Sequence, residues 1–310
     1  MRKIVMLERD NIGEDVDLSY FEKLGDLTIY GTTPNHMVKE RIGDADVLVI
    51  NKIPMNETTL CDAANVKLIC VTATGTDNVD MEYCASRGIA VKNVRSYSTE
   101  SVVQHTFAMY FYISEKLRFY DDYVKNGDYM QCPRFTYFGE QFHELSGKTW
   151  GIVGLGEIGA RVAQIAKAFG CRVIYYSTSG RNNSDTYERV DWDTLLSQSD
   201  IISVHAPLNP QTKHLFTYDA FTKMKPSAYL INVGRGPIVN EGDLCRALNE
   251  NLIAGAGLDV LEKEPMAADN PLFAIKDSRK LLITPHIAWA TTEARSRLMR
   301  NVYKNIEENA

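Results

Sequence analysis

The sequence predicts an α/β protein built from two open parallel sheets, each covered by helices on both faces in the doubly wound manner. Two observations support this fold class. Short apolar runs typical of strands alternate with helical stretches along all 310 residues. A glycine-rich stretch in the middle of the chain, residues 148–176, forms one strand–helix–strand pattern and opens a second sheet. The length suffices for two domains of ordinary size.

The first third of the chain supplies the strands of one sheet. Each is a short apolar run, and helical stretches such as 20–24 and 37–42 separate them. Alternation of this kind is typical of a parallel sheet with helical crossovers. The predicted strands are 3–7, 27–31, 47–51, 67–72 and 89–94.

The central stretch carries the pattern G-x-G-x-x-G at Gly154, Gly156 and Gly159, between the apolar run 148–153 and a one-sided amphipathic helix. In this context Gly154 permits a tight turn, Gly156 lets a pyrophosphate approach the backbone, and Gly159 lets helix pack on strand. The helix N-terminus then offers N–H groups and a positive dipole to phosphates. We therefore predict a dinucleotide site. The alternative is a glycine-rich turn that holds no ligand.

The remaining elements define the domain organisation. A long apolar helix, 98–117, precedes the glycine pattern, and an aromatic stretch without clear periodicity, 120–143, separates them. Such a long irregular stretch is expected to be functional or an interface arm. We expect a dinucleotide-binding domain of residues 99–287 inserted in a discontinuous domain of residues 1–98 and 288–310. Further strands are predicted at 201–205, 228–233, 256–260 and 281–285, and a final helix at 292–308.

Composition narrows the classes of partner. The net charge of −6 argues against nucleic acid, and no apolar run approaches the roughly 20 residues of a membrane span. Residues 1–10 are too short in their apolar part for a signal peptide. The six cysteines form no C-x-x-C pair, so we expect reduced core thiols, no metal site and a cytoplasmic protein.

Titratable residues follow three predicted strands of the second sheet. Arg235 lies between two glycines after the strand 228–233, and its planar guanidinium suits a carboxylate. His286 follows the strand 281–285 and can act as an acid or base. Three acids in the stretch 257–265 could partner that histidine, and composition alone does not choose among them: Asp259, Glu262 and Glu264.

These motifs together resemble the D-2-hydroxyacid dehydrogenase family over essentially the whole length, with most similarity to its glycerate dehydrogenase and hydroxypyruvate reductase branch. The resemblance implies a Rossmann nucleotide domain inserted in a flavodoxin-like substrate domain. It also implies a catalytic trio, which falls on Arg235, Glu264 and His286. The matching stretches are 71–80, 93–105, 151–159, 205–212, 231–237, 259–265 and 285–291, the last containing Trp289.

The resemblance further implies reduction of a small 2-oxo acid, hydroxypyruvate or glyoxylate, to D-glycerate or glycolate, and the reverse reaction. His286 would donate the proton, Arg235 would stabilise the ketone oxygen, and Glu264 would favour the protonated imidazole. D-lactate or aromatic D-2-hydroxyacid oxidation stays open, as does a nucleotide-sensing, corepressor-like binding protein. Relatives dimerise through the nucleotide domain, so a homodimer is expected. The implied substrate-binding residues are Thr74, Gly75, Thr76, Arg235 and Trp289.

The end of the second strand of the glycine pattern bears on the cofactor. NAD-specific proteins place an acid there, about 20 residues beyond the glycines, to hold the ribose 2′-hydroxyl. Here that position is Ser177, followed by donors that suit a 2′-phosphate: Thr178, Ser179 and Arg181. We expect NADPH to be preferred and NADH also to be used; the alternative is a polar loop that ignores the ribose.

The resemblance adds further cofactor contacts, and Asp259 is expected to hold the nicotinamide carboxamide. His105, on the long helix, is expected to be a hydrogen-bonded core histidine. The other implied cofactor-binding residues are Glu157, Ile158, Ala206, Pro207, Thr212, Val233 and Gly234.

Overall fold

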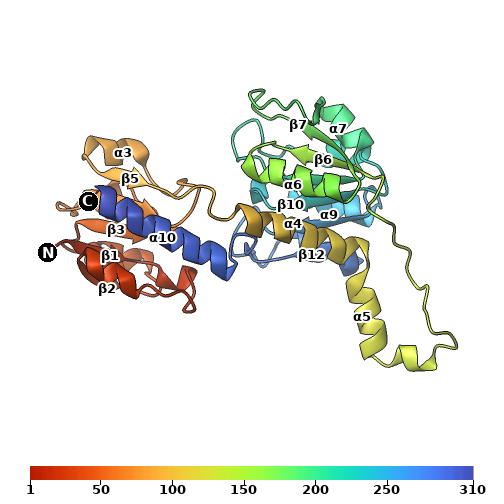
Figure 1. Ribbon diagram of the computed structural model, residues 1–310, viewed down its shortest axis with the longest axis horizontal. Helices are drawn as coiled ribbons and strands as arrows, with labels where there is room; N and C mark the ends of the chain where they lie inside the picture. Colours follow the sequence, from red (N-terminus) through yellow and green to blue (C-terminus); the bar gives the residue numbers. More distant parts are fainter. Residues whose placement is uncertain (310) are drawn as a thin grey trace. The chain divides into compact units, whose positions relative to one another are not determined.

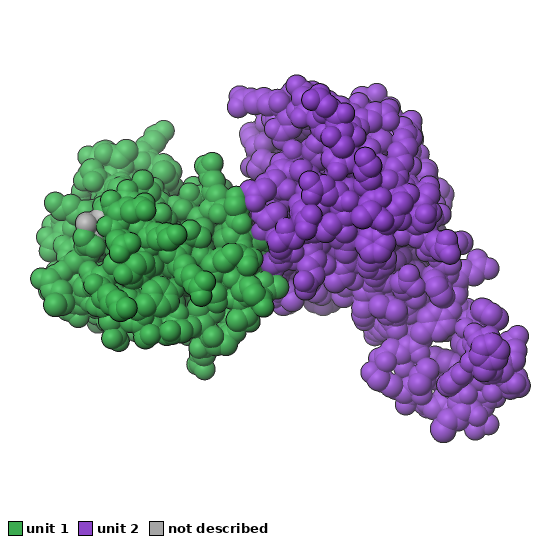
Figure 2. Space-filling view, in the orientation of Figure 1, with its two compact units in different colours: residues 1–98, 289–310 green, residues 99–288 purple. Residues whose placement is uncertain are grey.

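Two parallel sheets organise the chain, which confirms the predicted fold class (Figure 1). The computed structural model describes residues 1–309. Unit 1 comprises residues 1–98 together with those from Trp289 onward, and unit 2 comprises Thr99–Ala288 (Figure 2). The division expected from the sequence differs from this one only at residue 288.

Unit 1 contains a five-stranded sheet with the order β2-β1-β3-β4-β5, in which every neighbouring pair is parallel. Its order reverses at the first strand, as in doubly wound folds. β3 and β4 are buried along their whole length, which explains why their sequences are continuous apolar runs. The strands are β1 Lys3–Met6, β2 Asp26–Ile29, β3 Val47–Ile50, β4 Leu68–Val71 and β5 Ala90–Lys92.

Helices cover both faces of this sheet. The last helix, α10 (Thr292–Asn309), buries Ala294, Leu298, Met299, Val302 and Ile306 in a core shared with β1, β3 and β4. The end of the chain therefore completes the unit that its beginning forms. The other face is covered by α1 (Val38–Ile42), α2 (Glu57–Leu60) and α3 (Met81–Ser86), and 3-10 turns lie at η1 Arg9–Asn11, η2 Ser19–Leu24 and η3 Asn35–Met37.

Unit 2 contains a seven-stranded parallel sheet with the order β12-β11-β10-β9-β6-β7-β8. The chain starts at β6, proceeds outward through β7 and β8, and returns to β9 on the other side of β6. The switch point thus lies between β6 and β9, where doubly wound sheets bind ligands. The strands are β6 Thr149–Val153, β7 Arg172–Tyr176, β8 Glu188–Arg189, β9 Ile201–Val204, β10 Tyr229–Asn232, β11 Gly255–Leu258 and β12 Leu281–Ile283.

Two helical layers enclose this sheet. α4 (Thr99–Ser114) and α6 (Glu157–Ala168) share one apolar core with it, and α7 (Trp192–Gln198), α8 (Tyr218–Lys223) and α9 (Glu241–Asn249) share the other. The 3-10 turns are η5 Gly236–Ile238, η6 Pro271–Ala274 and η7 Ser278–Lys280.

The stretch 120–143 is less irregular than expected. Helix α5 (Leu117–Lys125) and the turn η4 (Asp128–Gln131) lie in or across it, and Lys116, in the left-handed conformation with φ 56°, separates α5 from α4. We call residues 117–143 the arm; it extends from the body of unit 2 (Figure 1). The prediction of a wholly irregular segment was therefore wrong. None of the residues of α5 is buried, and its aromatic side chains contact others of the arm, such as Tyr123 stacked on Tyr137 at 3.9 Å.

All six cysteines are free thiols, and four of them are buried. Burial raises the pKa of Cys70 to about 12 and that of Cys171 to about 11, which keeps both thiols protonated and unreactive. Among residues 1–309, no helix combines the length and apolar character needed to cross a membrane.

Candidate active site

The glycine turn after β6 has the geometry expected of a dinucleotide cradle. Gly154 has φ +91°, and a β-carbon on it would lie 3.0 Å from the backbone of Ala206. A β-carbon on Gly159 would lie 2.2 Å from the carbonyl oxygen of Gly154, so only glycine lets α6 approach β6 this closely. At Gly156 the same test meets no described atom within 4 Å, so the backbone there faces open space.

Helix α6 begins directly after this turn. Its N-cap is Gly156, and within the described chain no side chain caps that end. Backbone N–H groups of the first turn therefore remain for an anion. Glu157, in that turn, accepts a hydrogen bond from Thr99 Oγ1 at 2.6 Å, and Ile158 packs against the core shared with α4.

The order of the sheet collects most predicted residues of unit 2 at one edge. Gly154 follows β6, Ser177 follows β7, and Ala206 is the second residue after β9. The carboxyl ends of neighbouring parallel strands meet along one edge of a sheet, so residues distant in sequence become neighbours there. Beyond the switch point, Val233, Gly234 and Arg235 follow β10, Asp259 follows β11, and His286 follows β12.

The turn that carries Arg235 is fixed by a buried amide. Asn232, fully buried at the end of β10, donates from Nδ2 to the Arg235 carbonyl at 3.0 Å and accepts the Gly234 N–H at 3.0 Å. A β-carbon on Gly236 would lie 1.8 Å from the carbonyl oxygen of Leu261, so this turn packs directly on the segment that leads to Glu264. Two of the predicted catalytic side chains therefore come from segments in direct backbone contact.

Glu264 and His286 form the central contact of the site. His286 Nδ1 lies 2.7 Å from Glu264 Oε2, and Glu264 Oε1 accepts the N–H of Leu261 at 2.9 Å. Because a carboxylate only accepts, the proton on this side belongs to Nδ1. Nε2 is thereby left as the ring nitrogen that can give or take a proton.

The backbone of His286 adopts the left-handed conformation, with φ 57°. Its N–H donates to the carbonyls of Asp259 at 2.8 Å and Thr284 at 2.9 Å. A histidine with this φ is uncommon, so the surrounding hydrogen bonds must hold the turn.

Asp259 supplies most of those bonds. Its carboxylate, 1% exposed, accepts from Thr284 Oγ1 at 2.6 Å, from the N–H of Ile287 at 2.9 Å and from the N–H of Ala288 at 2.8 Å. Burial by itself would raise the pKa of Asp259, but hydrogen bonds from His105, Thr284, Ala288 and Ile287 together hold it below its usual value. Asp259 is thus ionised and braces the turn of His286, a role that the sequence did not indicate.

The predicted cofactor residues that follow β7 differ in how far their side chains are exposed. Ser177 is 6% exposed, and its Oγ has no hydrogen-bond partner among residues 1–309, so it is an unsatisfied polar group beside the glycine turn. Thr178 is half-buried, whereas Ser179 and Arg181 are exposed. Arg189, which the sequence did not single out, orders this loop by donating to the Gly180 carbonyl at 3.1 Å.

Two predicted contacts of the β9 end have different surroundings. Pro207 is exposed, next to the Ala206 backbone that packs on Gly154. Thr212 is fully buried, and its hydroxyl donates to the Pro207 carbonyl at 2.7 Å and accepts the Asn209 N–H at 2.8 Å. Thr212 therefore shapes this turn, and its contact with a cofactor stays a prediction.

The other predicted substrate residues lie in unit 1. Thr74, Gly75 and Thr76 form the loop after β4, where Thr74 Oγ1 donates to the Val94 carbonyl at 3.1 Å. Trp289 packs against the core of unit 1, with its ring 6.3 Å from that of Tyr97. The structure thus places the predicted catalytic trio and the predicted cofactor residues in unit 2. The substrate role of the four residues in unit 1 stays a prediction.

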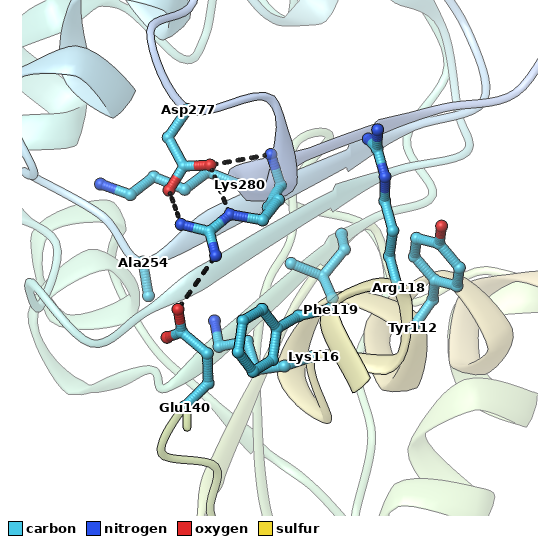
Figure 3. A pocket seen from close by; sticks show the side chains of 10 residues that line it. Tyr112, Lys116, Arg118, Phe119, Glu140, Ala254, Asp277 and Lys280 are labelled. Carbon is cyan, nitrogen blue, oxygen red and sulfur yellow. Dashed lines mark hydrogen bonds and ion pairs between the residues drawn. The ribbon is translucent and has the colours of Figure 1, made fainter. Parts of the chain in front are cut away.

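A cavity of about 90 Å³ lies at the opposite edge of the unit 2 sheet (Figure 3). Ala254 and Lys280, which precede β11 and β12, line it together with the junction of α4 and α5. Arg279 also lines it and is hydrogen-bonded to Asp277 at 2.9 Å and to Glu140 of the arm at 3.0 Å. Its lining contains none of the predicted site residues. The cavity therefore lies where the arm connects to the body of unit 2 and is not the candidate active site.

The fold and the glycine turn give unit 2 the features of a dinucleotide-binding domain, with a histidine paired to a glutamate at the carboxyl edge of its sheet. Comparison with known proteins gives the family. The model of the D-isomer specific 2-hydroxyacid dehydrogenase NAD binding domain matches residues 107–288. The chain is also 36% identical to a glycerate dehydrogenase of Methylorubrum extorquens over 99% of its own length and 95% of that protein. The chain therefore belongs to the D-isomer-specific 2-hydroxyacid dehydrogenases.

Other relatives agree with this assignment. A hydroxypyruvate reductase of Blautia hydrogenotrophica is 36% identical, covering 99% of this chain and 96% of that one. A D-lactate dehydrogenase from Aquifex aeolicus, solved with NAD and lactic acid, superimposes with a TM-score of 0.82 at 28% identity over 99% of this chain and 94% of that one. An acyclic imino acid reductase, solved with NADPH and D-Arg, superimposes with a TM-score of 0.86 at 29% identity, covering 98% of this chain and 96% of that one. The protein is an enzyme that uses a nicotinamide cofactor.

The bracing role of Asp259 makes a prediction about stability. The pKa of Asp259 is lower in the folded state than in the unfolded chain. Its ionised carboxylate therefore stabilises the fold at every pH above the unfolded pKa. This stabilisation is lost as the pH falls through the folded pKa. Asp259→Asn should lower the free energy of unfolding at pH 7 by about 1.5–3 kcal/mol, which is the contribution of one hydrogen bond to a charged group. Urea denaturation at pH 7 and pH 3.5 should show this difference narrowing in acid. An equal or wider difference at pH 3.5 would contradict the bracing role.

The contact between Glu264 and His286 makes a second prediction. Glu264→Gln keeps the shape but removes the negative charge beside the imidazole, so we expect reduction to slow by roughly 10- to 100-fold. The matched control is Glu262→Gln, two residues earlier, whose rate of reduction should match that of the wild type. A wild-type rate in the folded Glu264→Gln protein would refute the pairing.

Proposed function

We propose that this enzyme reduces a small 2-oxo acid, hydroxypyruvate or glyoxylate, to the D-2-hydroxy acid and catalyses the reverse reaction. The observation that carries the proposal is the 2.7 Å contact between His286 Nδ1 and Glu264 Oε2, at the same sheet edge as Arg235 and the glycine turn. The names of the relatives, glycerate dehydrogenase, hydroxypyruvate reductase and glyoxylate reductase, support this substrate class.

The residues divide the chemistry between them. When bound, the reduced nicotinamide supplies the hydride to C2 of the 2-oxo acid. His286 donates a proton from Nε2 to the ketone oxygen, and Arg235 stabilises the negative charge that develops there. The cation of Arg235 also attracts the substrate carboxylate. Overall, 2-oxo acid, reduced cofactor and one proton give 2-hydroxy acid and oxidised cofactor.

The sheet places these two groups within reach of one small molecule. β10 and β12 flank β11, so the strand ends that precede Arg235 and His286 are separated by about 10 Å. An extended arginine side chain covers much of that gap. The loop 74–76 of unit 1 is proposed to bind the substrate carboxylate through its backbone N–H groups, as the family resemblance implies.

The direct test is a substrate panel. Initial rates with hydroxypyruvate, glyoxylate, pyruvate and phenylpyruvate, each with NADPH and NADH, should be highest for one of the first two acids. His286→Ala should lower that rate by about 10²–10⁴-fold, the contribution of a general acid. Preference for pyruvate or phenylpyruvate would instead assign a D-lactate or aromatic D-2-hydroxyacid dehydrogenase. Wild-type rates in the His286→Ala protein would refute the mechanism.

We further propose that NADPH is preferred, with NADH also used. Ser177, at the position where an acid would hold the ribose of NAD, offers an unsatisfied hydroxyl in place of a negative charge. The exposed guanidinium of Arg181 follows in the same loop and suits a 2′-phosphate.

Two substitutions test the preference for NADPH. Arg181→Ala should raise the KM for NADPH several-fold and leave that for NADH unchanged, whereas Ser177→Asp should favour NADH by adding a charge that repels a 2′-phosphate. Arg172→Ala, which removes an exposed arginine at the start of β7, is the control and should change neither. A clear NADH preference in the wild type that Arg181→Ala leaves unaltered would defeat the phosphate clamp.

We also propose that the arm joins two copies of the chain into a homodimer. Its tip exposes large apolar side chains, Met130 at 80%, Phe135 at 92% and Phe138 at 78%. Aromatic and methionine side chains are enriched in the cores of protein interfaces. Arg279, bonded to both Asp277 and Glu140, ties the C-terminal segment of the arm to the body of unit 2.

Light scattering after size exclusion tests the dimer. The double substitution Phe135→Ser and Phe138→Ser should raise the dissociation constant at least about tenfold, the effect expected of interface anchors. Phe273→Ser, at an exposed phenylalanine of unit 2 outside the arm, should leave the mass unchanged. A wild-type monomer at micromolar concentration, or a dimer that survives the double substitution, would contradict this role.

A further inference from the structure

The turn that carries His286 is held from a second side by helix α4, which packs along β10, β11 and β12. Ser101 of α4 donates from Oγ to the Ala288 carbonyl at 2.6 Å. One helical turn later, His105 Nε2 lies 3.0 Å from Thr284 Oγ1 and 3.5 Å from Asp259 Oδ1. Both ends of residues 284–288, which we call the catalytic turn, are thus tied to one helix.

The positions of the protons in this network follow from its acceptors. Asp259 is ionised, so its oxygens only accept, and the Thr284 hydroxyl must donate its proton to Oδ1 at 2.6 Å. The oxygen of Thr284 is then free only to accept, so the hydrogen bond with His105 must be donated by Nε2–H. The network therefore has one direction, from His105 through Thr284 to Asp259.

We infer that His105 is a positioning residue for the proton donor His286. Its Nε2–H orients the Thr284 hydroxyl toward Asp259, and Asp259 then holds the N–H groups of Ile287 and Ala288 on the far side of His286. This fixes the left-handed backbone from which the imidazole meets Glu264. The inference rests on the proposed role of His286 as the acid.

The alternative is that His105 only fills space in the core of unit 2. The geometry argues against it, because the ring makes a directional bond to the one hydroxyl that links Asp259 to the catalytic turn. Thr106, the next residue on α4, shows the contrast: it is fully buried, and its hydroxyl donates to the Val102 carbonyl within the helix at 2.8 Å. Thr106→Val is therefore a matched control for a buried polar group of α4 outside the network.

Substitutions separate these two readings through kinetics. His105→Leu removes the donor and should lower kcat for reduction by roughly 10- to 100-fold with a small change in KM, because misplacement of a proton donor affects the chemical step. His105→Gln, which keeps an N–H donor, should recover most of the rate. Thr284→Val should lower kcat as much as His105→Leu does. The kcat of the double variant should lie no more than about twofold below that of the slower single variant, since both substitutions break the same chain of contacts. Thr106→Val should match the wild type.

Nitrogen-15 NMR of the full chain without cofactor supplies a readout that does not depend on turnover. The six histidines can be assigned by substitution, and His105 should show the Nε2–H form. The Nδ1–H signal of His286, which reports its bond to Glu264, should be lost or shifted in His105→Leu and retained in His105→Gln and Thr106→Val. If His105→Leu does not fold, Thr284→Val and His105→Gln give the same information.

The outcomes distinguish this inference from the proposed function. An active wild type in which folded His105→Leu or Thr284→Val keeps both kcat and the His286 signal overturns the positioning role alone. A wild type that reduces no 2-oxo acid overturns the proposed function, and the NMR comparison then decides whether His105 orients the catalytic turn. A loss of rate in His105→Leu that His105→Gln does not recover, with the His286 signal intact, also contradicts the inference.

Discussion

The carboxylate of Asp259 is the constraint on which the site depends. It lies at the end of β11, in the centre of the half-sheet β12-β11-β10, and it accepts hydrogen bonds from the segment that follows β12. A buried charge is costly unless several donors satisfy it, and here the donors are the side chain and amides of the catalytic turn. The same bonds that keep Asp259 ionised therefore hold His286 in its unusual backbone conformation and bring its ring to Glu264.

The parallel sheet explains how so many functional groups reach one place. Each crossover returns the chain to the same edge, so the segments that follow most strands of unit 2 add groups to that edge. The glycine turn follows β6, the buried Ser177 with its unpaired hydroxyl follows β7, and Arg235 follows β10 with its cationic side chain. Because these groups belong to strand ends and not to free loops, their spacing is determined by the sheet.

Much of this could be predicted from the sequence, for a physical reason. The glycine turn has local requirements, since Gly154 has a positive φ and Gly159 has no room for a β-carbon, and such requirements appear as a short pattern. The alternation of elements predicted both sheets. The family resemblance selected Glu264 from three candidate acids, and in the structure its Oε2 lies 2.7 Å from His286 Nδ1.

The rest depends on contacts between residues distant in sequence. Asp259 was expected to hold the nicotinamide, and its bonds to residues 284–288 have no local signature. His105 was expected to be a hydrogen-bonded core histidine, but its partner Thr284 lies 179 residues away, so the sequence could not identify that partner. The partners of α5 are aromatic residues of its own arm, such as Tyr137 against Tyr123, and none of its residues is buried in the core of unit 2.

The most direct measurement is a crystal structure of the enzyme with oxidised or reduced nicotinamide cofactor and an unreactive 2-oxo acid analogue. The account predicts His286 Nε2 within hydrogen-bonding distance, about 2.6–3.2 Å, of the oxygen that replaces the ketone, with the Arg235 guanidinium contacting the same molecule. The account would be contradicted by a complex with cofactor and analogue both bound in which His286 Nε2 points away from the analogue. A complex in which Glu264 does not contact His286 Nδ1 would contradict it as well.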